Sequence, residues 1–179
     1  GPRHAADLAK LFRGAMAVLA SLKISQNDAI TGKRVNDEGT AYVYGEQLEG
    51  WSALCASIGL SPTLSSVDFA GCGLTPKALQ PLSEAIFAMA GVTSVNCLAN
   101  PIGEEGLATL VAAVKDSSVR SICGLTEGQT EADFSGQKLG PFDCKIMVAE
   151  FQFQGLIAEI NSLVLKGNLP CGRISKDND

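Results

Sequence analysis

Apolar residues recur through the middle of the chain at a fixed spacing. The segment that begins at Leu64 is repeated by the segment that begins at Val92, 28 residues later. The matched positions are Leu64 and Val92, Val67 and Val95, Phe69 and Cys97, Cys72 and Asn100, and Leu74 and Ile102. A period in the range of about 20–50 residues is typical of proteins built from stacked structural units.

Each period contains the pattern of one strand and one helix. Short alternating segments predict strands at 67–69, at 95–97 and within 160–169. Apolar residues three and four apart predict helices at 48–58, at 76–91, at about 103–115 and at about 141–153, with Trp51 in the core. The side chains predicted to face inward from the strands and the last helix are Val67, Phe69, Val95, Cys97, Ala132, Phe134, Leu163, Leu165, Met147 and Phe151.

Residues 1–40 read as an N-terminal helix followed by a loop. Residues 5–24 have the spacing of an amphipathic helix, and residues 25–40 are polar and rich in turn formers. One interpretation is a helix that covers the open end of the stack. The other is a helix that docks a partner or lies on a membrane surface, with Lys10, Phe12 and Arg13 as the contact residues.

The repeats occupy residues 41–172, with Ala41 and Val43 in or near the first strand. The rhythm is interrupted at about 119–130, where we expect an inserted strand pair or a protruding loop. Residues 173–179 form a polar tail. A sharp turn after each strand leaves backbone groups that need partners, and Asn100 and Asn168 are placed to supply them, with Cys72 as a smaller variant.

The motif L-x-x-L-x-L-x-x-(N/C)-x-L resembles the leucine-rich-repeat consensus. A period of about 28 with full helices resembles the ribonuclease-inhibitor-like class of these proteins, and residues 121–143 are similar to a block in leucine-rich-repeat proteins of algae and other protists. The resemblance implies an α/β fold: a short right-handed solenoid with parallel strands on its concave side, helices on its convex side and the N-terminal helix as a cap.

Composition narrows the function classes. The net charge of −5 and the pI of about 4.9 argue against a nucleic-acid partner. No apolar stretch is long enough for a transmembrane span, and no charged segment followed by an apolar segment predicts a secretory signal, so we expect neither. Six cysteines without a C-x-x-C pair favour buried thiols in an intracellular, reducing compartment, either the cytoplasm or an organelle after removal of a transit peptide. A disulfide framework is the alternative that the even count leaves open.

Little in the sequence points to catalysis. The single histidine, His4, lies near the N-terminus, so no Ser/His/Asp or Cys/His arrangement can be built, and we predict no enzyme activity, metal or cofactor. We expect instead a concave surface that binds protein partners. Its residues are Tyr42, Ser66, Asp68, Ser94, Asn96, Glu131, Asp133, Ser135 and Lys166. The alternative is that these residues are merely strand side chains facing solvent.

The sequence therefore favours a non-catalytic interaction module, or a scaffold or accessory subunit of a larger assembly. Regulation of a small GTPase is the alternative, because the resemblance extends to the activators of the nuclear GTPase Ran. Arg120 is the nearest candidate for a catalytic arginine by repeat position.

Overall fold

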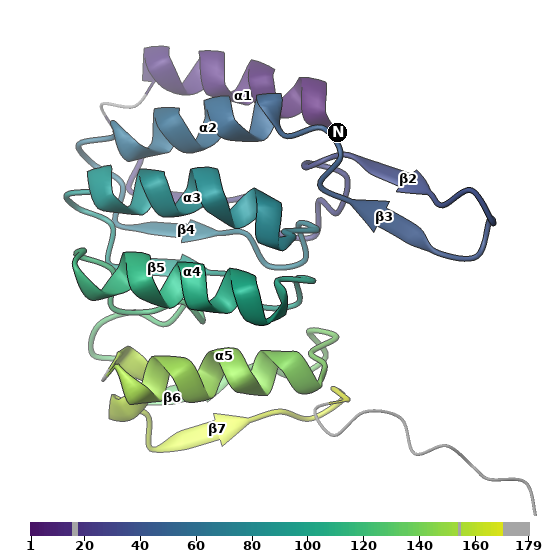
Figure 1. The fold of residues 1–179 in the computed structure, drawn as a ribbon. Coiled ribbons are helices and arrows are strands. Elements are labelled where there is room, and N and C mark those ends of the chain that lie inside the picture. Colours follow the sequence, from purple (N-terminus) through teal and green to yellow (C-terminus); the bar gives the residue numbers. More distant parts are fainter. Residues whose placement is uncertain (16–17, 154, 170–179) are drawn as a thin grey trace, which may run out of the picture.

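The computed structural model describes residues 1–15, 18–153 and 155–169. It shows a mixed α/β fold in which helices line one side and parallel strands lie behind them (Figure 1). The helices are α1 (Pro2–Ala15), α2 (Glu49–Gly59), α3 (Pro76–Ala88), α4 (Gly103–Lys115), α5 (Pro141–Gln152) and the short 3-10 helix η1 (Leu156–Glu159). The strands are β1 (Ser21–Lys23), β2 (Lys33–Val35), β3 (Tyr42–Tyr44), β4 (Ser66–Asp68), β5 (Ser94–Asn96), β6 (Glu131–Asp133) and β7 (Ser162–Val164).

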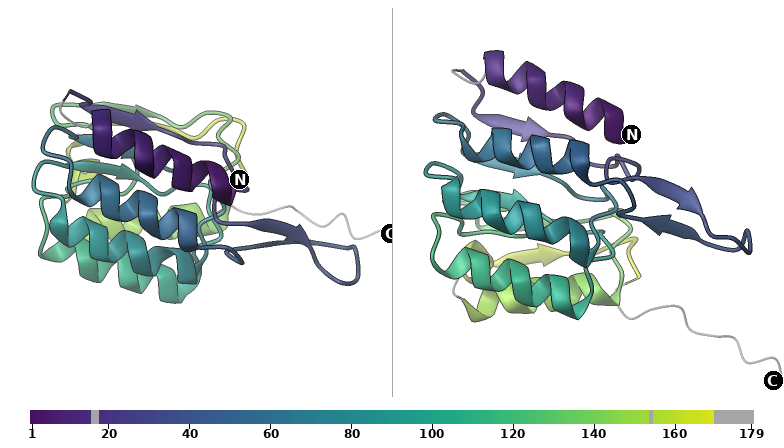
Figure 2. Two further views of the ribbon diagram at one scale, coloured as in Figure 1. Left: turned by 90° about the horizontal axis from the view of Figure 1, so that it is seen from above. Right: turned by 45° about the horizontal axis from the view of Figure 1, so that its top comes forward.

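Strands β1, β4 and β5 form one parallel sheet, and the helices pack against each other in chain order beside it (Figure 2). The register aligns the central residues Leu22, Val67 and Val95, which are all buried. Their neighbours on either side point to the opposite face, because side chains alternate along a strand. The buried central residues therefore mark the face of the sheet that packs against the helices, and their neighbours lie on the other face.

The sequence predicted either an inserted strand pair or a protruding loop at 119–130, and residues 119–125 do not protrude. The first half of this segment continues the sheet beside β5, since the Val95 amide donates to the Ser121 carbonyl at 2.8 Å and the Cys97 amide donates to the Ile122 carbonyl at 2.9 Å. Ile122 and Leu125 are buried. The short turn at 126–130 is largely exposed.

Strands β6 and β7 form a separate parallel sheet at the C-terminal end of the described chain. Two predicted inward positions are wrong here: the side chain of Leu163 is 46% exposed and that of Phe151 is 62% exposed. Met147 is buried as predicted. Leu163 is exposed because no helix or strand of the described residues packs on the outer side of β7.

The N-terminal region differs most from the sequence prediction. The helix expected at 5–24 ends at Ala15 in α1, and residues 21–23 form β1 instead. Leu22 lies in register with Val67, so its burial between neighbouring units outweighs the helical spacing of the local sequence. The helix α1 packs on α2 at the end of the helix row (Figure 1). The predicted polar tail, 173–179, lies outside the described residues.

Residues 33–40 of the expected loop and the strand expected near Ala41 and Val43 form one antiparallel hairpin. Strand β2 pairs with β3 through Lys33 opposite Tyr44 and Val35 opposite Tyr42. This hairpin forms its own two-stranded sheet and projects from the edge of the stack (Figure 1). The sequence prediction placed Tyr42 in the main sheet, and the structure places it on this projection.

A continuous apolar core joins the helices to the strands, and Trp51 lies at its centre as predicted. The indole is fully buried, its Nε1 donates to the Ala78 carbonyl at 2.8 Å, and its ring meets Phe69 edge-on with centroids 5.0 Å apart. The hydrogen bond satisfies the one polar atom of a large apolar group. Trp51 therefore ties α2 to both α3 and the residue after β4.

Candidate interaction surfaces

The face of the parallel sheet away from the helices is the first candidate surface. It carries the paired outward positions Ser21, Ser66 and Ser94, then Lys23, Asp68 and Asn96. Lys23 is exposed, and Ser66, Asp68 and Asn96 are half-buried. The structure thus brings four of the predicted binding residues, Ser66, Asp68, Ser94 and Asn96, onto neighbouring strands.

Ser94 is a correction within this group, because only 2% of it is exposed. It lies in register between Ser66 and Ser121 and so has a neighbour on each side. Gly124, with a φ of +81°, brings the chain directly against Asn96, where a Cβ would lie 2.8 Å from the Asn96 Cβ. The accessible part of the surface is therefore centred on β1 and β4.

Three of the predicted binding residues accept a hydrogen bond from a backbone amide in the turn after their strand. The Oδ1 atoms of Asp68, Asn96 and Asp133 accept the amides of Ala70, Leu98 and Ser135, at 3.0, 3.1 and 2.8 Å. Side-chain oxygens that accept an amide two residues ahead stabilise turns. The Ser135 hydroxyl and amide also hold the pKa of Asp133 below its ordinary value. Each of these side chains therefore stabilises the turn that follows its strand.

The second sheet carries the remaining predicted positions. Glu131 and Asp133 are exposed on β6, and Ser135 and Lys166 are exposed just beyond β6 and β7. The Gly136 amide donates to the Lys166 carbonyl at 2.8 Å, so Ser135 and Lys166 lie on adjacent segments. This group is separate from the β1–β4–β5 sheet in its hydrogen bonding.

The β2–β3 hairpin is the second candidate surface, and sequence reasoning missed it. The Lys33 Nζ lies 4.0 Å from the ring centroid of Tyr42 and 2.5 Å from the Asp28 carboxylate. The bond to Asp28 raises the pKa of Lys33. Tyr42 is 60% exposed. The structure shows why the period did not reveal it: Leu22 and Val67 are in register but 45 residues apart, which exceeds the 28-residue period by 17 residues.

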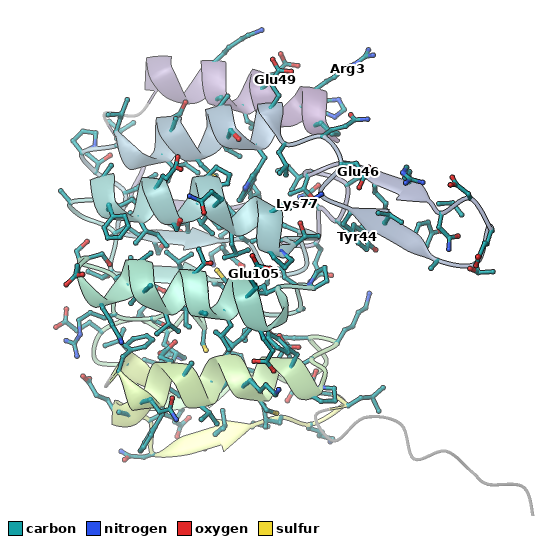
Figure 3. The ribbon with its side chains drawn as sticks, viewed as in Figure 1. Arg3, Tyr44, Glu46, Glu49, Lys77 and Glu105 are labelled. Atoms are coloured by element: carbon teal, nitrogen blue, oxygen red, sulfur yellow. The ribbon has the colours of Figure 1, made fainter. Side chains whose placement is uncertain are left out.

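The root of the hairpin is fixed to the body of the protein. The Thr31 hydroxyl donates to the Gly73 carbonyl at 2.9 Å, and the Gln47 amide donates to the Thr31 carbonyl at 3.1 Å. A Cβ at Gly73 would lie 2.7 Å from Cδ1 of Tyr44, so glycine permits the ring to pack there. Figure 3 shows Tyr44 and Glu46 at this root, with Lys77 of α3 on the same edge of the stack.

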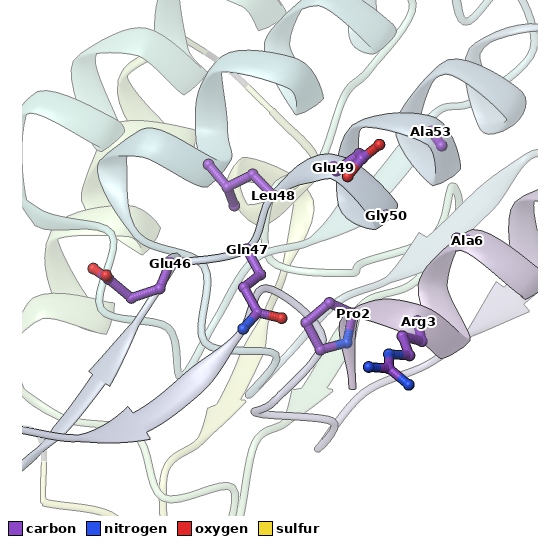
Figure 4. A pocket seen from close by; sticks show the side chains of 9 residues that line it. All are labelled: Pro2, Arg3, Ala6, Glu46, Gln47, Leu48, Glu49, Gly50 and Ala53. Carbon is purple, nitrogen blue, oxygen red and sulfur yellow. The ribbon is translucent and has the colours of Figure 1, made fainter.

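A groove of about 740 Å³ lies between the root of the hairpin and the starts of α1 and α2 (Figure 4). Its charged lining residues are Arg3, Glu46 and Glu49, and Gln47 and Leu48 form part of its wall. Glu46 is already 3.7 Å from the Arg34 guanidinium. The predicted docking helix borders this groove only through its first turns. Lys10 is exposed beside Asp7, and the side chains of Phe12 and Arg13 lie outside the described part of the structure.

Two buried carboxylates on α5 bond this helix to neighbouring segments of the chain. Neither of them was identified from the sequence. Glu150 is fully buried and accepts the Ser121 hydroxyl and the Ile122, Cys123 and Ile157 amides at 2.8–3.1 Å. Asp143 accepts the Ala99 amide at 2.6 Å and the Gly140 amide at 2.8 Å. Both carboxylates are surrounded by backbone donors, which is the pattern of a structural carboxylate.

The chemistry available elsewhere is limited. Cys55, Cys72, Cys97 and Cys123 are buried free thiols, and burial raises the pKa of each of them, that of Cys72 to about 11. Within residues 1–15, 18–153 and 155–169, no group of three or more His, Cys, Asp or Glu side chains is placed to hold a metal ion. The same residues include no helix of the length and hydropathy that crossing a bilayer requires.

Arg120 does not project alone from the surface. Its Nη2 donates to Glu159 Oε1 at 3.0 Å, and both side chains are about half exposed. The small-GTPase interpretation that rests on Arg120 stays a prediction.

Comparison with known proteins adds one similarity. No protein-family model matches the chain. The chain is 30% identical over 109 residues to NACHT, LRR and PYD domains-containing protein 5 of Bos taurus. The alignment covers 60% of this chain but only 9% of the length of that much longer protein. The similarity thus links the chain to a protein whose name includes leucine-rich repeats.

Proposed function

We propose that this chain is a non-catalytic protein-interaction module, built as a short right-handed leucine-rich-repeat solenoid of the ribonuclease-inhibitor-like class. The in-register parallel strands and the named leucine-rich-repeat relative support this assignment. In a solenoid the strand side is the concave side, and such extended curved surfaces are used for binding. The chain would act alone or as an accessory subunit of a larger assembly, in a reducing compartment.

The observation that carries the proposal is the row of outward positions on β1 and β4. Lys23 and Ser21 of β1 lie in register with Asp68 and Ser66 of β4, and the described helices lie on the other side of this sheet (Figure 1). The Ser66 hydroxyl donates to the Ser21 hydroxyl at 2.9 Å, which fixes the two strands side by side. A row of mixed polar groups is suited to a polar protein surface, and hydrogen bonds already hold the side chains of Ser21, Ser66 and Asp68 before binding.

The test is co-purification of tagged protein from its native source, quantified for two matched variants. Ser66→Arg places a bulky cation on the strand face, and Gln80→Arg places the same side chain on the exposed surface of α3. We expect Ser66→Arg to lose the partners that the unaltered protein retains and Gln80→Arg to keep them. Equal retention by both variants, or loss with Gln80→Arg alone, would contradict binding through the strand face. Circular dichroism of both variants establishes that each is folded.

A further inference from the structure

We propose that the outer edge of β3 is a strand-addition site for an extended segment of another protein, a short uncharged stretch flanked by basic residues. This surface is distinct from the strand face of the parallel sheet. Strands β2 and β3 bond only to each other within the described residues, so each has one unpaired edge. Unpaired strand edges are templates for pairing with another chain.

The hydrogen-bond alternation identifies the groups on the open edge. The Gly45 amide donates to the Gly32 carbonyl at 3.1 Å, and the Asn36 amide donates to the Ala41 carbonyl at 2.8 Å. Residues along an antiparallel strand alternate between bonding inward and pointing outward. The amides and carbonyls of Tyr42 and Tyr44 therefore point away from β2, where a further strand would pair.

The two edges of the hairpin differ in charge. Strand β2 contains Lys33 and Arg34, and charged residues on an edge strand discourage pairing. Strand β3 contains only Tyr42, Val43 and Tyr44, and the flanking residues 39–41 and 45 are also uncharged and contain no proline. Aromatic and β-branched residues are those most favoured in strands. The β3 edge is thus open and suited to pairing.

The hairpin is held in shape before any partner binds. An isolated two-stranded hairpin is marginally stable at best, but this one is fixed at both ends. Asn36 Oδ1 accepts the Thr40 and Ala41 amides at 2.8 and 3.1 Å at the tip, and Thr31 anchors the root through Gly73. A preorganised edge loses little conformational freedom when a strand is added.

Charge defines the ends of the incoming segment. Residues 28–46 contain two cations, Lys33 and Arg34, and four carboxylates, those of Asp28, Asp37, Glu38 and Glu46. Lys33 pairs with Asp28, and Arg34 lies 3.5 Å from Asp37 and 3.7 Å from Glu46, so an acidic surplus remains. Asp37 and Glu38 precede β3 and Glu46 follows it. Basic residues at the two ends of an uncharged strand would meet these carboxylates.

A second copy of this chain is the less suitable occupant. Strand β3 has three residues, and pairing of two such edges buries much less than the roughly 1,200 Å² of a stable protein–protein interface. Two copies would also bring the same acidic surplus together. A peptide segment needs only the edge, since main-chain hydrogen bonds supply its affinity.

The test titrates the complete protein with the peptide K-K-T-V-Y-V-T-K-K and records amide chemical shifts and hydrogen exchange by NMR. We expect the Tyr42 and Tyr44 amides to shift and to exchange more slowly, and the peptide E-E-T-V-Y-V-T-E-E to bind at least about tenfold more weakly. Tyr42→Pro removes the outward donor, whereas Tyr42→Val keeps it and removes only the ring. Proline is tolerated where an edge amide faces solvent, so Val35→Pro on the β2 edge is the matched control.

Binding that is at least about tenfold weaker in Tyr42→Pro, but retained in Tyr42→Val and Val35→Pro, is the result that the proposal predicts. If Tyr42→Pro unfolds the hairpin, Glu38→Lys provides the second variant and is expected to weaken binding of the lysine peptide. Absence of protection at Tyr42 and Tyr44 up to millimolar peptide would overturn the proposal. So would a peptide-independent dimer in sedimentation that Tyr42→Pro dissociates, because the edge would then belong to a second copy.

Discussion

Asn100 donates from its Nδ2 to the carbonyl of Phe69, 31 positions earlier in the chain, at 2.9 Å. The same nitrogen donates to the Cys97 and Leu98 carbonyls at 3.0 Å, and Asn100 Oδ1 accepts the Leu74 amide at 3.0 Å. One buried side chain thus satisfies backbone groups of its own turn and of the preceding unit. Such groups would otherwise be buried without partners.

The relationship recurs along the stack. Asn168 Nδ2 donates to the Phe134 carbonyl at 2.7 Å, and the Cys72 thiol donates to the Ile24 carbonyl at 3.1 Å. Both confirm the role predicted from the sequence for this position. Asn27 stands one unit earlier and donates to the Ile24 carbonyl at 2.8 Å, within its own turn.

Replacing Asn100 with alanine is expected to lower the free energy of unfolding by about 2–4 kcal/mol, because several buried backbone groups lose their partner. Chemical denaturation of the variant measures this. Asn36→Ala is the control, since Asn36 also makes several hydrogen bonds but is only half-buried, at the tip of the hairpin. Equal losses for the two variants would contradict the proposed role of the buried asparagine.

Glu150→Gln keeps the shape of the side chain but replaces one acceptor oxygen with a donor. Three groups donate to Oε2 of Glu150 and the Ile157 amide donates to Oε1, so an amide group must face at least one of these donors. We expect a loss of about 1–3 kcal/mol in thermal or chemical unfolding. Glu159→Gln breaks only the exposed pair with Arg120 and should cost less than about 1 kcal/mol. A neutral Glu150→Gln would show that the carboxylate is not needed at this position.

An element of this structure could be predicted from the sequence where nearby residues determine it, and could not where a distant strand pairing determines it. The period located α2 to α5 and the strands β4 and β5, because each unit repeats the same apolar positions. The prediction failed at residues 18–24, where local spacing predicted helix but pairing of Leu22 beside Val67 requires a strand. Local sequence carries no record of such a distant pairing.

The candidate surfaces show the same limit. Ser66, Asp68, Ser94 and Asn96 were placed together correctly because the period relates them. Tyr42 was misplaced because the hairpin interrupts the first unit, and Glu150 was not found because its donors lie about 28 residues away in a different segment. A lone glutamate in a helix gives no sign of burial until the tertiary contacts are known.

Gly73→Ala tests how the hairpin is attached. Gly73 has a φ of +70°, and a Cβ there would lie 2.6 Å from the Asp28 carbonyl and 2.7 Å from Tyr44 Cδ1. We expect a displaced hairpin root and a loss of about 1–3 kcal/mol. Gly128→Ala is the matched control, because Gly128 also has a positive φ, +78°, but has nothing within 4 Å. NMR shifts of Tyr44 that change equally in both variants would refute the packing explanation.

The buried thiols predict a loss of stability at alkaline pH. Burial raises the pKa of Cys72 from 9.0 to about 11, so the thiol ionises in the unfolded chain before it does in the native protein. A group with a raised native pKa contributes its full stability below the unfolded value, and this contribution falls as pH rises from about 9 to 11. Unfolding midpoints measured across this range should decline, and Cys72→Ala should flatten the decline. An unchanged slope in the variant would contradict a contribution from Cys72.

The central claim is that partners bind the strand side of the stack, and lysine cross-linking of the native complex tests it most directly. Lys23 lies on β1, whereas Lys77 and Lys145 lie exposed on α3 and α5. We expect mass spectrometry to find partner peptides joined to Lys23 and not to the two helix lysines. Cross-links confined to Lys77 and Lys145 would contradict it.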